Sequence, residues 1–274
     1  MALLKTAFVH NFATPVWRLL FEQVPGAPGL LLAELRDGSK RSLQVSTLQL
    51  PNGELLTHSL ELPWSAAVLG IWNGYALYHR LDNERLPVPT ALGCLDVRRG
   101  EIRWEWPGHM LSASDGQLVE ATRTSLAAGE MRQPVWFSLL EGQPVDGVKS
   151  ILPAPNPSLQ FPTHYPETSQ YWPLLNRFVE KYTNHLAIQA IDYLEVADKI
   201  IFSYYVYGNT GKKQSYLLIT DRQQTVWLHQ PLLEQTASDK DSERSDGLAG
   251  AFCVWQNQIL ALAQPTQLVS YFLT

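Results

Sequence analysis

Histidine is the side chain that most often carries acid–base or metal chemistry near neutral pH. The chain has seven histidines, at positions 10, 58, 79, 109, 164, 185 and 229. No two stand at the close spacing that would aim both rings at one ion, so the sequence predicts no metal site. His79 ends an apolar run before a longer loop, and His164 lies beside Tyr165 in a proline-rich stretch. For each, an ordinary hydrogen-bonded or solvated histidine is the simpler interpretation. If one is functional we choose His164, because insertions over a rigid scaffold often carry recognition.

Other patterns that carry catalysis do not occur in the sequence. There is no Gly-x-Ser-x-Gly motif of a serine hydrolase and no glycine-rich phosphate loop. The acidic run of Asp239, Asp241 and Glu243 superficially resembles a calcium loop, but Arg244 stands where such a loop needs glycine. The sequence therefore predicts no catalytic residue and no cofactor.

Aromatic and guanidinium side chains suit molecular recognition, because they bury a large area with little loss of entropy and keep a polar tip. Those that stand out are Arg36, Trp64, Trp72, Tyr165, Tyr204, Tyr205 and Tyr207. Sheet cores use the same residues, and core packing is the stronger interpretation for Trp72, Tyr204, Tyr205 and Tyr207. For Arg36, Trp64 and Tyr165 the two roles are closely balanced. The candidate ligand- or partner-binding residues are thus Arg36, Trp64, His79, His164, Tyr165 and Tyr205.

Composition excludes several classes of partner. The 274 residues carry a net charge of −5, and no cluster of lysine and arginine concentrates the positive charges, so a nucleic acid is not expected. No segment approaches the ~18 apolar residues of a membrane span, and the N-terminus does not read as a secretory signal. Cys94 and Cys253 both lie in apolar segments, which predicts buried, reduced thiols. A cytoplasmic protein that binds another protein or a small molecule is the expectation.

A weak internal repeat sets the expected architecture. Leu95–Ile102 and Leu48–Leu55 share an apolar strand, a polar turn ending in glycine, and a second apolar strand that opens with glutamate. Ser215–His229 has the same form, and its Trp227 lies 123 residues after Trp104, or three periods of about 41. Asparagine or aspartate turns recur upstream of these hairpins, at Asn73-Gly74, Asp115-Gly116, Asp198-Lys199 and Asn257-Gln258. Two interleaved hairpins per period predict four-stranded antiparallel units.

Units of this kind commonly stand in a ring, so we expect an all-β fold, a small β-propeller of five or six blades with five preferred. The predicted units are residues 16–62, 65–107, 110–146, 185–231 and 249–274. The last unit is one strand short, and Leu4–Phe12 at the other terminus is unassigned. Pairing this N-terminal strand with the last unit would close the ring. Residues 1–274 are expected to form one domain.

Two regions interrupt the repeat. Residues 147–183 form an insertion whose prolines, from Pro153 to Pro173, predict an extended loop before Thr168. One short amphipathic helix should follow, because apolar residues recur at helical spacing. They are Trp172, Leu175, Phe178, Val179 and Tyr182. Residues 234–248 are polar and of mixed charge, which is typical of a mobile surface loop.

The segment Ala91–Trp104 resembles the repeat of quinoprotein-like propellers, the pyrroloquinoline-quinone type, in which Leu-Asp is followed by a turn glycine and a tryptophan. The arrangement is also similar to a family of uncharacterised bacterial cytoplasmic proteins of similar length, through Leu35-Arg36-Asp37, Pro63-Trp64 and Leu95-Asp96 with Gly100-Glu101 and Trp104. The resemblance implies the propeller fold. It does not extend to the cofactor, because the quinoprotein enzymes have adjacent cysteines and about twice the length. The repeat tryptophan is expected to pack between neighbouring sheets.

A ring of five blades also raises the possibility of a glycosidase or lactonase, in which carboxylates converge in the central channel. We assign the innermost strand of each unit to its first strand, and in the four such strands considered only Asp192 offers a carboxylate. A non-catalytic binding or scaffolding module is therefore the leading hypothesis, and the channel enzyme is the alternative. Convergence of two carboxylates or a metal would favour the enzyme.

Overall fold

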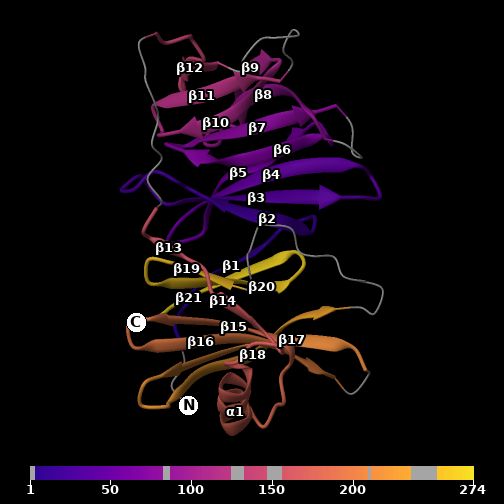
Figure 1. Ribbon diagram of the computed structural model, residues 1–274, viewed down its shortest axis with the longest axis vertical. Helices are drawn as coiled ribbons and strands as arrows, with labels where there is room; N and C mark the ends of the chain where they lie inside the picture. Colours follow the sequence, from indigo (N-terminus) through magenta and orange to yellow (C-terminus); the bar gives the residue numbers. More distant parts are fainter. Residues whose placement is uncertain (1–3, 83–86, 125–132, 147–155, 209–210, 236–251) are drawn as a thin grey trace. The chain divides into compact units, whose positions relative to one another are not determined.

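The computed structural model describes residues 4–82, 87–124, 133–146, 156–208, 211–235 and 252–274 (Figure 1). The chain divides into two compact units, residues 14–157 and residues 1–13 with 158–274. Each unit consists of antiparallel sheets, and each is described by itself. That all 274 residues form one domain stays a prediction.

The first unit contains three sheets, which succeed one another along the chain (Figure 1). The first sheet comprises β2 (Val16–Phe21), β3 (Leu30–Asp37), β4 (Ser42–Gln49) and β5 (Glu54–Leu62). The second sheet comprises β6 (Ala66–Trp72), β7 (Tyr75–Leu81), β8 (Pro89–Asp96) and β9 (Glu101–Pro107). The third sheet comprises β10 (His109–Ser114), β11 (Leu118–Arg123) and β12 (Pro134–Ser138). The first two sheets match the predicted four-stranded units. The third has three strands in the described residues, supplemented by a single bridge between Phe137 and Pro144.

In its described residues, the second unit contains two sheets of five strands. The fourth sheet comprises β14 (Thr163–Pro166), β15 (Ile188–Val196), β16 (Lys199–Tyr207), β17 (Lys213–Asp221) and β18 (Val226–Gln235). The fifth sheet follows the order β1 (Thr6–Asn11), β21 (Gln267–Phe272), β20 (Gln258–Gln264), β19 (Phe252–Trp255) and β13 (Leu159–Gln160).

The pairing predicted for the N-terminal strand is confirmed. Strand β1 runs antiparallel to β21, with Phe8 opposite Ser270 and Val9 opposite Val269. The pairing continues beyond the strands, because the Phe12 N–H donates to the Thr266 carbonyl at 2.8 Å. The two ends of the chain therefore complete one sheet.

The insertion differs in part from its prediction. Leu159–Gln160 and Thr163–Pro166 were expected in an extended loop, but they form the edge strands β13 and β14. Pro166 is tolerated there because an edge strand has one row of N–H groups that needs no partner. Of the predicted mobile loop at 234–248, residues 234 and 235 belong to β18, and the rest lies outside the described residues.

The predicted helix is confirmed as α1 (Trp172–Thr183), which begins with Pro173 in its first turn and ends at Asn184 in the left-handed conformation. Its apolar face lies against the fourth sheet, where Leu175 and Val179 join Phe202, Tyr204 and Leu218 in one buried cluster (Figure 1). At 12 residues, this helix of the described chain is neither long nor apolar enough to cross a membrane.

The second and fourth sheets are apolar on both faces, and each face packs against a neighbouring element. In the first unit the second sheet presents Val68 and Tyr78 to the first sheet and Leu77 and Leu92 toward the third. In the second unit the fourth sheet presents Ile201 and similar residues to the fifth sheet, and its other face to α1. Near-continuous burial explains why these strands read as apolar runs rather than as alternating patterns.

Several hairpin turns use residues in the left-handed region, where glycine carries little steric penalty. The predicted turn glycines Gly53 and Gly100 have φ of 71° and 68°, and the Asn73-Gly74 turn has φ of 50° and 83°. Two predicted turns lie one residue earlier than expected, since the positive φ falls on Ala197 and on Gln256.

Candidate functional site

Arg36 and Trp64, which the sequence singled out separately, lie together in the first unit. Arg36 is near the end of β3, and its guanidinium carbon is 5.2 Å from the centre of the Trp64 ring. Its Nη1 donates to the Trp64 carbonyl at 3.2 Å, and its Nη2 donates to the Ala66 carbonyl at 2.7 Å. Arg36 thus connects the first sheet to the segment that begins the second.

Glu34 precedes Arg36 by two residues, so both side chains project from the same face of β3. The Glu34 side chain is fully buried, and its Oε1 accepts from Arg36 Nε at 2.7 Å. Its Oε2 accepts from Nε of Arg18, on the neighbouring strand β2, also at 2.7 Å. Arg18 Nη2 donates in turn to the Val68 carbonyl of β6. We call Arg18, Glu34 and Arg36 the arginine–glutamate cluster.

The arginine–glutamate cluster has an excess positive charge and spare donors. Two guanidinium groups, which do not lose their protons in proteins, share one carboxylate. The Arg18 and Arg36 side chains are only 19% and 18% exposed, so little water screens that charge. Each guanidinium has five N–H groups. The hydrogen bonds above use two on Arg18 and three on Arg36, which leaves three and two.

Trp17 lies beside this charge. Its ring centre is 5.9 Å from the Arg36 guanidinium carbon, and the residue is 55% exposed. An exposed indole next to unfilled guanidinium donors can hold a ligand that has an anionic group and a flat apolar face.

Arg18, Glu34 and Trp17 were not among the residues predicted from the sequence. The available signal was a charge inside an otherwise apolar strand. Arg18 interrupts the run Val16–Phe21, and Glu34 interrupts Leu30–Leu35. A buried charge needs a partner, so such positions predict an ion pair even when the partner is unknown.

His164, a predicted binding residue, and Asp192, the one carboxylate found on the predicted inner strands, form a pair in the second unit. They are cross-strand neighbours on β14 and β15, and His164 Nδ1 lies 2.7 Å from Asp192 Oδ1. The Asp192 side chain is 7% exposed and that of His164 is 63% exposed. The carboxylate accepts the Nδ1 proton, which leaves the lone pair of Nε2 as the free base of the ring. The pair is a candidate general base.

Tyr165 and Tyr205 lie on the same sheet as this pair, on β14 and β16. Tyr165 follows His164 and therefore projects from the opposite face, where it lies 5.9 Å from Tyr171 and 6.3 Å from Tyr193 between ring centres. It packs against the buried cluster beneath α1, which favours the packing role. Tyr205 is half-buried on β16 opposite Ile188. The structure thus places His164 and Tyr165 on one strand but on different faces.

His79 links two sheets of the first unit. It lies on β7, and its Nε2 accepts a hydrogen bond from the Leu111 N–H of β10 at 2.9 Å. Burial lowers the pKa of His79 below its usual 6.5, which keeps the acceptor nitrogen unprotonated. This geometry favours a structural role for His79.

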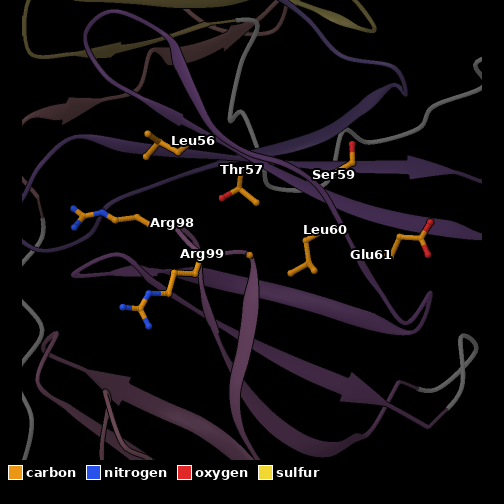
Figure 2. A pocket seen from close by; sticks show the side chains of 8 residues that line it. Leu56, Thr57, Ser59, Leu60, Glu61, Arg98 and Arg99 are labelled. Atoms are coloured by element: carbon orange, nitrogen blue, oxygen red, sulfur yellow. The ribbon is translucent and has the colours of Figure 1, made fainter.

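A shallow pocket of about 320 Å³ lies between β5 and the turn that joins β8 to β9. Figure 2 shows the side chains of Arg98 and Arg99 at one end of this pocket and that of Glu61 at the other. All three charged residues are exposed, so water screens them and little binding energy is available.

The remaining titratable groups give no metal centre of the usual type. Within the described ranges, no three or more side chains of His, Cys, Asp and Glu are placed to share an ion. Cys94 and Cys253 are buried free thiols, as predicted, and burial raises the pKa of both.

Trp104 belongs to the second sheet and donates to the Leu139 carbonyl at 2.8 Å, toward the third sheet. This contact confirms its predicted position between sheets.

No protein-family model and no curated protein matches this sequence. Three solved structures give weak similarities. The β-propeller domain of the Trilobed protease from Pyrococcus furiosus has 10% identity and a TM-score of 0.32, over 94% of this chain and 67% of that one. A mannose phosphorylase from Leishmania mexicana has 8% identity and a TM-score of 0.26, over 99% and 87%. The hydrazine synthase of Kuenenia stuttgartiensis has 10% identity and a TM-score of 0.26, over 92% and 79%. TM-scores in this range do not establish a shared arrangement of sheets.

Proposed function

We propose that this protein is a binding module for a ligand that carries a carboxylate beside a flat, apolar face. The observation that carries the proposal is that Arg18 and Arg36 share the single buried carboxylate of Glu34 and keep unused N–H donors. A ligand carboxylate would accept from those donors and neutralise the excess charge. Trp17 would supply the stacking surface.

The chemistry of the cluster favours a carboxylate over other anions. Guanidinium groups form planar, paired hydrogen bonds to carboxylates and phosphates. The excess is one positive charge, which a monoanion balances and a phosphate dianion would exceed. An aromatic acid or a sugar acid combines this charge with a flat face.

The test is calorimetric titration of the full chain with two matched ligand pairs, benzoate with benzamide and galacturonate with galactose. Only the anion of a pair should bind, and its affinity should fall at least tenfold in Arg18→Gln. That variant stays folded because Glu34 keeps Arg36 as its partner. Trp17→Ala should weaken the same anion without changing stability, since the residue is exposed.

Arg99→Gln is the control, because it removes an equal charge from a side chain that is 67% exposed in the same unit. Equal binding of benzoate and benzamide, with no binding of galacturonate, would refute the proposal. Equal losses in Arg18→Gln and Arg99→Gln would refute it too, since they would indicate a general charge effect.

The His164–Asp192 pair favours a second candidate function, hydrolysis of an ester or lactone. Nε2 of His164 would take a proton from a water molecule as the water oxygen attacks the carbonyl carbon, and Asp192 would stabilise the imidazolium that forms. The imidazolium would then give that proton to the leaving alcohol oxygen as the ester carbon–oxygen bond breaks. The paired-carboxylate mechanism of glycosidases gains no support, because Asp192 pairs with an imidazole. Asp192→Asn and His164→Gln should each lower γ-butyrolactone hydrolysis about 100-fold. Equal rates in wild type and both variants would remove this candidate.

For the fold we propose a five-bladed propeller. The five antiparallel sheets that the described residues form and the pairing of β1 with β21 support this arrangement. Small-angle X-ray scattering tests it, since a compact chain of this length has a radius of gyration of about 19 Å. Two separated units would give a clearly larger value.

A further inference from the structure

A second group of polar side chains gathers beside the end of α1, on the fourth sheet. Tyr204 lies on β16 and is fully buried. Its hydroxyl oxygen is 3.1 Å from His185 Nδ1 and 2.9 Å from His229 Nε2. The two histidines are 44 residues apart in the chain, so their spacing in the sequence gives no sign of this arrangement.

Three separate elements carry the hydroxyl and the two imidazoles. Tyr204 and His229 project from the same face of the sheet, the face that α1 covers. His185 comes from the segment just after α1, where Asn184 has a φ of 58° and turns the chain back toward the sheet. The His185 N–H donates to Thr183 Oγ1 at 3.1 Å, which fixes the backbone that carries the ring.

The separations of the Tyr204 hydroxyl oxygen from the two ring nitrogens fit coordination of one ion. Nitrogen and oxygen ligands lie about 2.0–2.1 Å from a transition metal, and two ligands at roughly 90–100° to each other are then about 2.9–3.1 Å apart. The two measured separations fall within that interval. The imidazole ring centres are 5.2 Å apart at 62°, so the rings approach the hydroxyl from different directions.

The surroundings favour a cation with access from solvent. Both histidines are partly exposed, so the group lies near the surface of the unit. The last carbonyl groups of α1 lie close in sequence to His185, and the negative end of a helix favours positive charge.

We propose that His185, Tyr204 and His229 bind a divalent first-row transition-metal ion, with Cu²⁺ bound more tightly than Zn²⁺. The order follows from the general affinity series for nitrogen and oxygen ligands. On binding, the Tyr204 O–H bond breaks, its proton leaves to solvent, and a metal–oxygen bond forms. Each imidazole contributes one lone pair, and water fills the remaining positions.

The experiment is titration of the chelator-treated full chain with Cu²⁺, followed by calorimetry and visible absorption. Wild type should bind one tight equivalent and show a tyrosinate-to-copper charge-transfer band. Tyr204→Phe keeps the buried ring and should lose the band. His185→Gln and His229→Gln should each weaken copper binding by more than about 100-fold. Loss of a residue that only hydrogen-bonds to a ligand typically costs roughly 10- to 100-fold, so a larger loss indicates a direct ligand. An excess of Zn²⁺ should displace the copper only partly.

Two control variants lie on the same sheet outside this group. Tyr193→Phe removes a hydroxyl that bonds to Glu195, and His164→Gln removes an exposed imidazole. Both should keep the band and the affinity. The proposal is overturned if wild type binds no copper, if the band survives in Tyr204→Phe, or if affinity is unchanged in the double variant His185→Gln/His229→Gln. Because His185 is half-buried and follows the helix, its variant reports on binding even if Tyr204→Phe unfolds.

Discussion

Substitution of Glu34 by glutamine tests the electrostatics of the arginine–glutamate cluster most directly. The change keeps the size of the side chain and removes only its negative charge. Glu34 is fully buried and holds Arg18 and Arg36 at 2.7 Å each. Without the carboxylate, two guanidinium groups would face each other with no opposite charge between them.

The size of the effect follows from the contacts. Two unit charges about 4 Å apart attract by roughly 4 kcal/mol at an effective dielectric constant of 20, and Glu34 makes two such pairs. Desolvation of the buried groups offsets much of this attraction, and removal of one partner from a buried ion pair typically costs about 3–5 kcal/mol. A loss in that range corresponds to a decrease in Tm of about 6–20 °C for a domain of this size.

The assay is denaturant unfolding of wild type, Glu34→Gln and the control Glu61→Gln at neutral pH. Size-exclusion chromatography of each protein beforehand confirms that it is monodisperse. Glu61 is exposed, so its variant should stay within about 0.5 kcal/mol of wild type. Benzoate should restore more stability to Glu34→Gln than to wild type, because it replaces the missing charge. A loss below about 1 kcal/mol in Glu34→Gln would refute the reasoning, since the carboxylate would then contribute little net attraction.

Three further predictions concern the framework. Gly93→Ala should destabilise by about 1–3 kcal/mol in thermal melts, since its Cβ would lie 2.2 Å from Cζ of buried Tyr78, whereas Gly38→Ala, with open space around it, should not. The difference in unfolding free energy between wild type and His79→Gln should be constant above pH 6.5. Wild type should lose stability relative to the variant as the pH drops from 6.5 through the lowered pKa of His79, because protonation removes the acceptor for the Leu111 N–H. Parallel pH profiles of the two proteins would contradict this. Deletion of strand β1 should lower the Tm and cause association in size-exclusion chromatography, because it leaves β21 as an unpaired edge. An unchanged elution volume and Tm would show that β1 contributes nothing to the fifth sheet.

Much of the fold could be predicted because each hairpin carries a local signal. Turn residues such as Gly53 and Gly100 adopt a backbone conformation that few other residues accept, so they mark where strands reverse. The insertion was harder to interpret. Its prolines exclude a central strand but not an edge strand, and only contacts with distant residues decide between an edge strand and a loop. Pro166 pairs with Ala190 as an edge residue, which no local pattern indicates.

The candidate sites were less predictable, because each depends on pairs that are distant in the chain. Arg36 stood out as a residue type, but its role depends on Glu34 and Arg18, and the link to Arg18 exists only because β2 pairs with β3. The spacing of His185 and His229 in the sequence predicts no shared metal ion. The sheet and the end of α1 bring them to one hydroxyl.

Directional polar contacts complement the apolar packing between the sheets of the first unit. Glu22 accepts from the N–H groups of Asn73 and Gly74 at 2.9 and 3.0 Å, His79 accepts from the Leu111 N–H, and Trp104 donates to a carbonyl near the third sheet. Apolar faces alone specify the position of one sheet on another only loosely, whereas a hydrogen bond to one backbone group fixes it. These side chains therefore set the register between neighbouring sheets.

Arg18 and Arg36 also bond to the backbone of the neighbouring sheet, yet they differ from these contacts in one respect. Glu22 and His79 are acceptors that match the backbone N–H donors beside them. The two arginines instead bring more donors and more positive charge than Glu34 and the carbonyl groups of β6 accept. A purely structural connection would need one arginine, since one guanidinium satisfies one carboxylate in paired geometry. The second arginine adds desolvation without a matching charge, and an anionic ligand would supply that charge.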